Sequence, residues 1–327
     1  AFMVNASFHV CAEEADLVAI YQKALAHDAL LASVRFENEA TQELISQGRS
    51  LFLPSITATA NYGENDNERK ILTPGISSNE LLSGNKAEYH GYDYGITVTQ
   101  PLFNYRAFQQ YKQILSQTSL SEKKLLQAQQ DLIYRVSLVY FETLMARDEI
   151  RLLQVQKASI NEQLIESEAR YDVGLISITD VNEAQTKAAM IDAQIIAAIQ
   201  RLKIKKRQIE SLTGELPNKI KGINSAVSFV AISDMMEDWI SLATENNLEL
   251  KIMEDEIKIV DREIDVRRSD HYPTVDAIAS RSRNWDKGGF PYGALQNEGV
   301  RSFSDVLGVQ INIPIFSGGY TSSRVRE

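Results

Sequence analysis

Hydrophobic and polar residues alternate strictly in two pairs of segments, and the second pair repeats the first 219 positions later, with Pro54 corresponding to Pro273. An alternation with a period of two predicts strands that have one apolar and one polar face. Each strand is about nine residues long, which is the length of a strand that crosses a membrane. The pattern therefore predicts β-hairpins over residues 54–100 and 273–314.

The polar segments inside the two hairpins, Gly63–Gly91 and Arg283–Ser302, are long and rich in Asn, Glu, Ser and Gly. They are typical of extracellular loops and favour membrane-spanning strands, although a soluble antiparallel sheet with one solvated face alternates in the same way. Two hairpins are too few to close a barrel, and lipid offers no partner for an open strand edge. A membrane location therefore requires an oligomer.

The hydrophobic period changes to that of a helix between the two hairpins. No Pro or Gly interrupts the chain from Tyr105 to Arg170, and apolar residues recur there every seven positions. A return segment follows a 3-4 spacing from Val181 to Leu212 and is broken only at Lys205. Sustained heptads predict coiled-coil packing, and 65 helical residues would extend about 100 Å. We predict a long helical hairpin over 104–213, with this seven-residue series on its first helix: Leu125, Leu132, Val139, Ala146, Leu153 and Ile160.

The turn of this helical hairpin is predicted at residues 171–181. Gly174 can adopt the turn conformation, and either Ser177 or Thr179 can cap the return helix. Shorter helices are predicted over Leu17–Arg49 and Met236–Arg268, before the two β-hairpins. The expected organisation is a first repeat over 13–216, an irregular segment over 217–235 and a second, incomplete repeat over 236–327.

Composition narrows the possible functions. The chain has 327 residues and a net charge of −10, which argues against nucleic-acid binding, and it contains no apolar run of about 18 residues. The four His are scattered, and no phosphate-binding or nucleophile motif is present, so we predict no catalytic, metal or cofactor-binding residues. Residues 1–12, with the single Cys11, are interpreted as the remnant of a secretory signal; an ordinary N-terminus is the alternative.

The order of these motifs resembles the TolC-like outer-membrane channel family of Gram-negative bacteria. The most specific segment is Tyr171–Val181, and the strand entries and exits at Pro54, Pro101, Pro273 and Pro314 also match. The resemblance implies a mostly α fold with transmembrane β-structure. It implies a trimer whose long coiled-coil helices form an α-helical barrel, while each subunit adds four strands to one twelve-stranded outer-membrane β-barrel.

The resemblance also implies a function and partners. The protein would be the passive exit duct of a tripartite efflux pump or type I secretion system, spanning from the outer membrane into the periplasm. Its partners would be a periplasmic adaptor protein, an inner-membrane pump or ABC transporter, and outer-membrane lipid; no cofactor is implied. The adaptor-contacting tip would comprise five residues: Arg170, Tyr171, Val173, Gly174 and Leu175.

The family resemblance also assigns Thr179 and Asp180 to the hydrogen bonds that close the periplasmic entrance. Their other interpretation is ordinary capping of a helix. The family has a second long helical hairpin, whereas this chain stops at Glu327, so a C-terminally truncated member is expected. A soluble coiled-coil scaffold is the alternative function. A periplasmic adaptor is a weaker one, because the chain lacks the expected flanking segments.

Overall fold

The computed structural model describes residues 15–69, 85–223, 235–287 and 300–327. The predicted signal remnant over 1–12 and most of the irregular segment over 217–235 lie outside these ranges. The chain divides into two units, one formed by Ala1–Ala40 and Leu120–Met253 and the other by Thr41–Ser119 and Glu254–Glu327. Within the described ranges, none of the helices combines the length and the hydrophobicity needed to cross a membrane.

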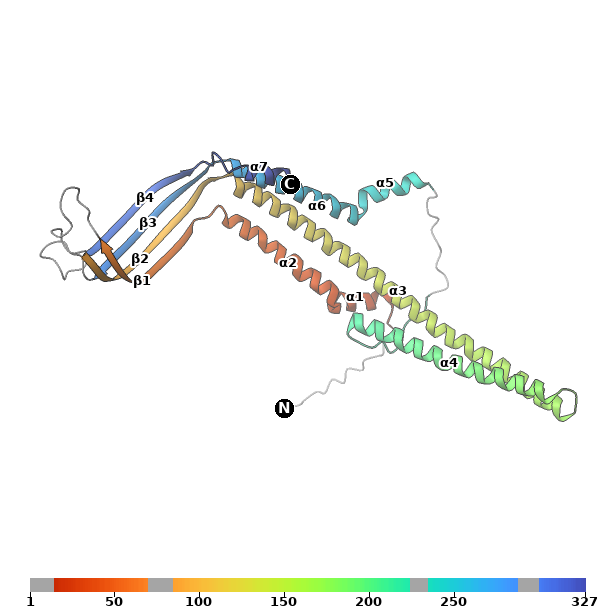
Figure 1. Cartoon of the computed structure of the whole chain (residues 1–327). Coiled ribbons are helices and arrows are strands. Elements are labelled where there is room, and N and C mark those ends of the chain that lie inside the picture. Colours follow the sequence, from red (N-terminus) through yellow and green to blue (C-terminus); the bar gives the residue numbers. More distant parts are fainter. Residues whose placement is uncertain (1–14, 70–84, 224–234, 288–299) are drawn as a thin grey trace, which may run out of the picture. The chain divides into compact units, whose positions relative to one another are not determined.

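The elements follow one another as two helices, two strands, a helical hairpin, two more helices, two more strands and a short C-terminal helix (Figure 1). The helices are α1 Leu17–His27, α2 Ala29–Ser50, α3 Tyr105–Asp172, α4 Ile178–Thr213, α5 Met236–Asn246, α6 Leu248–Arg268 and α7 Tyr320–Arg326, with a 3-10 turn at Ser269–His271. The strands are β1 Ser55–Arg69, β2 Asn85–Asn104, β3 Thr274–Lys287 and β4 Val300–Asn312. The predicted fold class, mostly helical with antiparallel β-structure, is confirmed.

One continuous helix was predicted over Leu17–Arg49 and another over Met236–Arg268. Both predictions were wrong, because each segment forms two helices separated by one break. The breaks fall at Asp28 and Asn247, which are equivalent positions of the repeat. In both copies the breaking residue adopts an extended conformation, and its N–H donates 2.8 Å to the carbonyl of an Ala four residues earlier. Its side chain then accepts hydrogen bonds from the first turn of the next helix. Asp and Asn favour this geometry because their short side chains compete with the helical backbone.

Helices α3 and α4 pack against each other along the predicted heptads. All six residues of the α3 series are buried or half-buried, as are Val181, Ile191 and Ala198 on α4. Ion pairs join the two helices at three levels, and one of them uses Lys205, the residue that interrupts the apolar series, which lies 2.9 Å from Glu142. A charge is tolerated in the seam because it meets an opposite charge across it.

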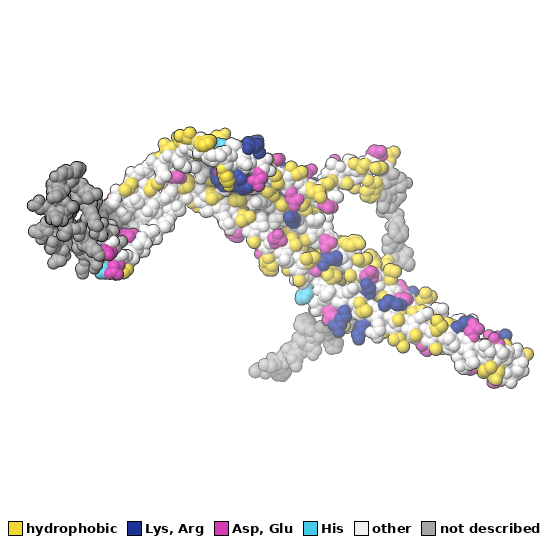
Figure 2. Space-filling view, viewed as in Figure 1, with side chains coloured by type: hydrophobic (Ala, Val, Ile, Leu, Met, Phe, Trp, Pro, Cys, Tyr) yellow, Lys and Arg dark blue, Asp and Glu magenta, His cyan; other side chains and the backbone are white. Residues whose placement is uncertain are grey.

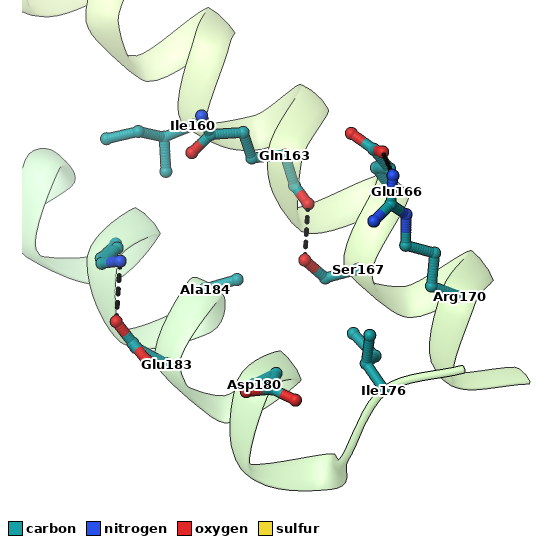
Figure 3. A pocket seen from close by; sticks show the side chains of 10 residues that line it. Ile160, Gln163, Glu166, Ser167, Arg170, Ile176, Asp180, Glu183 and Ala184 are labelled. Atoms are coloured by element: carbon teal, nitrogen blue, oxygen red, sulfur yellow. Dashed lines mark hydrogen bonds and ion pairs between the residues drawn. The ribbon is translucent and has the colours of Figure 1, made fainter. Parts of the chain in front are cut away.

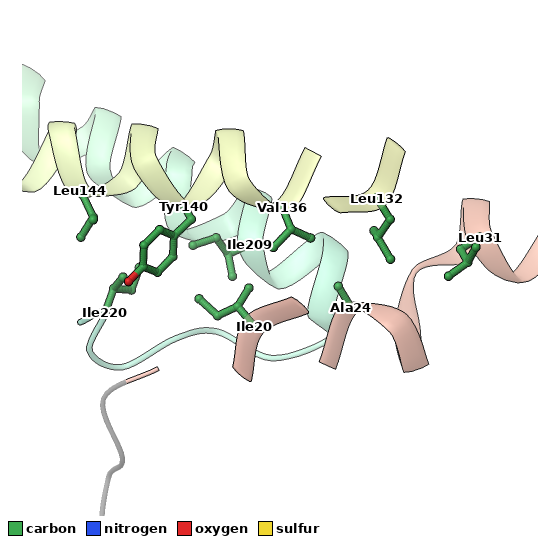
Figure 4. Close-up of a cluster of buried hydrophobic side chains, with 9 residues drawn as sticks. All are labelled: Ile20, Ala24, Leu31, Leu132, Val136, Tyr140, Leu144, Ile209 and Ile220. Atoms are coloured by element: carbon green, nitrogen blue, oxygen red, sulfur yellow. The ribbon is translucent and has the colours of Figure 1, made fainter. Parts of the chain in front are cut away.

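The base of the helical hairpin contains the main hydrophobic cluster of the first unit (Figure 4). Leu132, Val136 and Tyr140 of α3 pack there with side chains from α1, the start of α2 and the end of α4. The Tyr140 hydroxyl donates 2.6 Å to the Lys221 carbonyl, and a short parallel bridge pairs Ala15 with Ile220. Burial of these side chains ties the segment after α4 to the entry of α1.

The four strands form one antiparallel sheet in the order β1-β2-β3-β4 (Figure 1). The strands extend further than predicted: β1 continues to Arg69 and β2 begins at Asn85, so much of the predicted Gly63–Gly91 loop is paired strand. Likewise β3 and β4 extend into the predicted Arg283–Ser302 loop. These parts were missed because they lack the apolar alternation that reveals a strand in sequence.

Strand β2 also passes the predicted end of the hairpin at residue 100 and reaches Asn104. The register with β3 shifts between Pro101 and Phe103, and β1 pairs only from Thr99 inward. Pro101 has no N–H to donate, and it is accommodated because it sits at a bulge where the strand has lost one neighbour.

In the second unit, the end of α2 approaches α3 closely. A β-carbon placed on Gly48 would lie 2.8 Å from a ring carbon of Tyr111, so this contact requires glycine. Polar contacts join α3 to α6: the Ser119 hydroxyl donates 2.9 Å to the buried Asp255 carboxylate, and the Gln113 amide donates 2.7 Å to Glu263.

One buried ion pair stabilises the break between α1 and α2. The Asp28 side chain is 5% exposed, and Arg135 of α3 donates to both of its carboxylate oxygens at 2.9 and 3.0 Å. The same carboxylate accepts from the Leu31 N–H at 2.8 Å and caps α2. Asp28 therefore joins the cap of one helix to the surface of another.

We predict that Arg135→Met lowers the free energy of unfolding by about 3 kcal/mol, because it leaves the Asp28 carboxylate buried without its countercharge. Chemical denaturation of the purified protein measures the change. The control is Arg151→Met. Arg151 is 78% exposed, and its ion pair with Asp148 of the same helix is long, at 3.7 Å. That variant should change stability by less than about 0.5 kcal/mol. Equal losses in the two variants would contradict a special role for the Asp28 pair.

The same pair predicts a pH dependence. Hydrogen bonds from the Arg135 guanidinium hold the pKa of the Asp28 carboxyl below its ordinary value, against the opposing effect of burial. A carboxyl with a lowered folded-state pKa stabilises the protein above its ordinary value of about 4, and this contribution is lost as the pH falls through the lowered pKa. Asp28→Asn should therefore flatten the stability profile below about pH 4. An unchanged acid limb in this variant would show that other carboxyls cause it.

Candidate functional site at the turn between the long helices

The end of α3 is closed by two hydrogen bonds around a left-handed glycine. The Leu175 N–H donates 2.9 Å to the Arg170 carbonyl, and the Gly174 N–H donates 2.8 Å to the Tyr171 carbonyl. Gly174 has φ 72°, a conformation that costs a side-chain-bearing residue energy. Together these contacts form the Schellman arrangement that terminates many helices. The turn is therefore a defined structure that the chain can present to a partner.

A reciprocal capping box begins α4. The Ser177 hydroxyl accepts from the Asp180 N–H at 3.4 Å, and the Asp180 carboxylate accepts from the Ser177 N–H at 2.9 Å. Of the two predicted caps, Ser177 is thus the one used. Thr179 lies inside the first turn of α4, and its exposed hydroxyl has no hydrogen-bond partner within the described residues.

The turn exposes apolar side chains at its outermost point. Val173 is 69% exposed and Leu175 is 73% exposed, while Tyr171 and Ile178 beside them are also exposed. Exposed apolar groups that are held rigidly by backbone hydrogen bonds lose little entropy when a partner covers them. The five predicted tip residues lie together at this end of the hairpin, with Arg170 paired to Glu166 of its own helix at 2.5 Å.

A groove of about 320 Å³ lies between α3 and α4 directly behind the turn (Figure 3). Its floor includes Ile160, Ile176 and Ala184, and its rim carries charged side chains. Glu183 of α4, labelled in Figure 3, forms an ion pair within its own helix, with Lys187 at 2.8 Å. The groove could accept an apolar side chain while the rim charges contact polar groups of the same partner. Within the described ranges, no three metal-ligand side chains come together.

The two predicted gate residues are both exposed, and they differ in their hydrogen bonds. Asp180 is exposed and borders the groove, but its carboxylate is bonded to Ser177 in the capping box. Thr179 is exposed beside it. The helix-capping interpretation is therefore correct for Asp180.

Helix α3 carries a second apolar stripe that its predicted heptad series does not include. Leu138, Met145 and Leu152 are seven residues apart and are 44%, 71% and 66% exposed. They lie beside the series that packs on α4, and hydrophobic side chains are visible along the exposed surface of this hairpin (Figure 2). The stripe could have been found by testing for a second heptad series on the same helix. Extended apolar surface of this kind marks an interaction site.

Comparison with known proteins assigns the chain to a family. The outer membrane efflux protein family matches residues 20–215 and 239–327, which is most of the sequence. The chain belongs to the outer membrane efflux protein family. Family membership leaves the soluble-scaffold alternative without support.

Relatives of this efflux-family chain include secretion proteins. The proteases secretion protein PrtF of Dickeya chrysanthemi is 26% identical over 321 residues, covering 97% of this chain and 67% of PrtF. The outer membrane protein TolC of Vibrio cholerae is 27% identical over 320 residues, covering 95% and 67%. The alkaline protease secretion protein AprF of Pseudomonas aeruginosa is 27% identical over 318 residues, covering 94% and 62%. The chain thus spans about two thirds of the length of these relatives.

Solved structures share the fold of this family member. One is CusC, whose structures were reported for its folding and transmembrane channel formation. It has a TM-score of 0.74 at 14% identity, and the match covers 100% of this chain and 72% of CusC. The CmeC outer membrane channel of Campylobacter jejuni has a TM-score of 0.72 at 14% identity, covering 95% and 64%. At these identities the similarity shows the fold alone.

Proposed function

We propose that this protein forms the outer-membrane exit duct of a tripartite efflux pump or a type I secretion system. The observation that carries the proposal is the four-stranded sheet, which is too small to close and has one exposed apolar face. Ile56, Ile96 and Leu307 on that face are 71%, 54% and 87% exposed. Lipid would cover such a face, and copies of the sheet would pair the edge strands β1 and β4.

A trimer satisfies both requirements of the sheet. Three copies of a four-stranded sheet make a closed twelve-stranded barrel, which leaves no open edge in the lipid. The opposite face carries polar residues such as Thr57, Thr97 and Ser282 and would line a water-filled pore. The exposed stripe at Leu138, Met145 and Leu152 would pack against neighbouring helices of the same assembly. Transport through such a duct is passive, and no residue is assigned a catalytic role.

The exposed turn at Val173, Gly174 and Leu175 would bind a periplasmic adaptor protein. The adaptor would in turn join the duct to an inner-membrane pump or ABC transporter. The secretion proteins PrtF and AprF among the relatives support this assignment. Thr179 and Asp180, one turn behind, would contribute to closing the periplasmic entrance, and an adaptor that competes for these helices would shift the equilibrium toward the open state.

The proposal is tested by extracting the full-length protein from outer membranes and measuring its mass by light scattering in detergent. We expect a trimer that conducts ions in planar bilayers. A monomer recovered in the aqueous fraction would overturn the proposal, because no closed pore could then exist.

We predict that the double variant Met145→Glu/Leu152→Glu raises the concentration at which the trimer dissociates by about tenfold or more. Burying each of these side chains contributes about 1.5–3 kcal/mol, and the new charges oppose burial. The matched control is Gln154→Glu, which adds a charge at an exposed polar position of the same helix. Light scattering over a dilution series measures the effect. Trimers of equal stability in both proteins would show that the stripe is not an assembly surface.

For the turn, we predict that Leu175→Asp weakens adaptor binding by about tenfold or more and leaves the trimer intact, because one buried Leu contributes about 1.5–3 kcal/mol. Surface plasmon resonance with the purified adaptor measures the affinity. The control is Gln156→Asp, at an exposed position of α3 that precedes the turn; this variant should bind the adaptor with unchanged affinity. Unaltered affinity of the Leu175 variant would remove the turn from the adaptor interface.

A further inference from the structure

Three cross-strand pairs form a ladder on the apolar face of the sheet. From the helix-proximal side outward, the pairs between β3 and β4 are Arg281 with Asp305, Arg283 with Phe303, and Trp285 with Arg301. Successive members are two residues apart on their strand, so all six side chains lie on one face. Register with β1 and β2 puts Ile56, Val98 and Leu307 on this same face, one level nearer the start of β1.

The kind of contact in the ladder changes along the strands, from an ion pair to cation–π contacts. The first pair is an ion pair, with Arg281 Nε 3.1 Å from Asp305 Oδ1, so its charges offset each other. The outer two arginines instead lie over aromatic rings. The Arg283 guanidinium is 5.3 Å from the centre of the Phe303 ring, and that of Arg301 is 4.5 Å from the centre of Trp285. These are attractive cation–π distances.

An aromatic row marks the outer limit of the apolar band. Tyr62, Tyr92 and Trp285 lie side by side on β1, β2 and β3, with ring centres 4.9 and 6.0 Å apart. Such rows occur at the headgroup level of membrane-spanning sheets because the rings favour the interface between lipid and water. Arg301 lies in this row beside Trp285, and Arg283 lies one level nearer the helices. With the row at the headgroup level, both long side chains can reach the lipid headgroups at the end of the strands away from the helices.

The two stacked arginines keep their hydrogen-bonding edges available. Among the described residues, neither Arg283 nor Arg301 forms an ion pair, and the next carboxylate outward on this face, Glu64, lies 3.8 Å from His90. A guanidinium that stacks by its face still presents N–H groups in its plane, in a fork that matches phosphate oxygens. The local excess of two positive charges therefore selects an anion with several acceptor oxygens.

We propose that Arg283 and Arg301 bind the phosphate groups of a phosphorylated lipid in the outer leaflet of the membrane. The aromatic rings hold the guanidinium planes, the apolar residues below receive the acyl chains, and the phosphates complete the charge balance. This inference rests on the proposed membrane-spanning function of the sheet. A lipid is the occupant that fits, because apolar side chains on the same face flank the Arg281–Asp305 pair: Ile96 beside Arg281 on β2, and Val98 and Leu307 one level further toward the helices.

The test is native mass spectrometry of the trimer in an uncharged detergent, titrated with lipid A that carries its phosphates. We expect the double variant R283Q/R301Q to bind lipid A about tenfold or more weakly, because it loses charge-assisted hydrogen bonds. The matched control is R281Q/D305N, which removes the neighbouring ion pair without changing the net charge and should bind as the unaltered protein does. Equal affinity of R283Q/R301Q and the unaltered protein would overturn the proposal.

A second measurement needs no variant. Dephosphorylated lipid A should bind the unaltered trimer about tenfold or more weakly than the phosphorylated form, and equal binding of the two lipids would overturn the proposal. Inorganic phosphate should not displace bound lipid A at equal concentration. Displacement would show a site for free phosphate and would likewise overturn the lipid assignment. Failure to recover a trimer would instead contradict the proposed duct. A failure of the lipid site can therefore be distinguished from a failure of the duct.

Discussion

Apolar surface that the chain cannot cover by itself is the constraint on which the rest of this structure depends. The sheet has only four strands, so β1 and β4 keep open edges and one face exposes aliphatic side chains. Helix α3 also exposes apolar surface: one heptad series packs on α4, while Leu138, Met145 and Leu152 stay exposed. Both surfaces require neighbours, and lipid together with other copies of the chain provides them.

The duplicated helix break shows how one local device is adapted to two environments. At Asp28 and Asn247 the same extended residue ends one helix and caps the next. Asn247 is exposed, and its neutral amide is sufficient there. Asp28 is buried, so its charge requires the paired Arg135. Burial decides the difference, because an unpaired charge is costly away from water and nearly free on the surface.

The turn and the sheet both fix the backbone by internal hydrogen bonds and expose side chains from it. At the turn, the Schellman bonds and the capping box satisfy the backbone polar groups, so Val173 and Leu175 are presented on a rigid support. On the sheet, the strand register holds Arg283 and Arg301 over aromatic rings. In both places the backbone uses its hydrogen bonds internally and leaves the side chains free for partners.

The sequence by itself determined the elements that have a local period: the strands after Pro54 and Pro273, the heptads of the long helices, and the turn at Gly174. It also indicated the family, because the order of these motifs is specific. Local periodicity failed where polar residues continue a strand beyond the apolar band, and where Asp28 and Asn247 interrupt a helical pattern. Only the tertiary structure decided that Arg135 meets Asp28 and that the register stacks Arg301 on Trp285. These contacts join residues of different elements, and no periodic pattern in a single segment carries information about the partner it will meet.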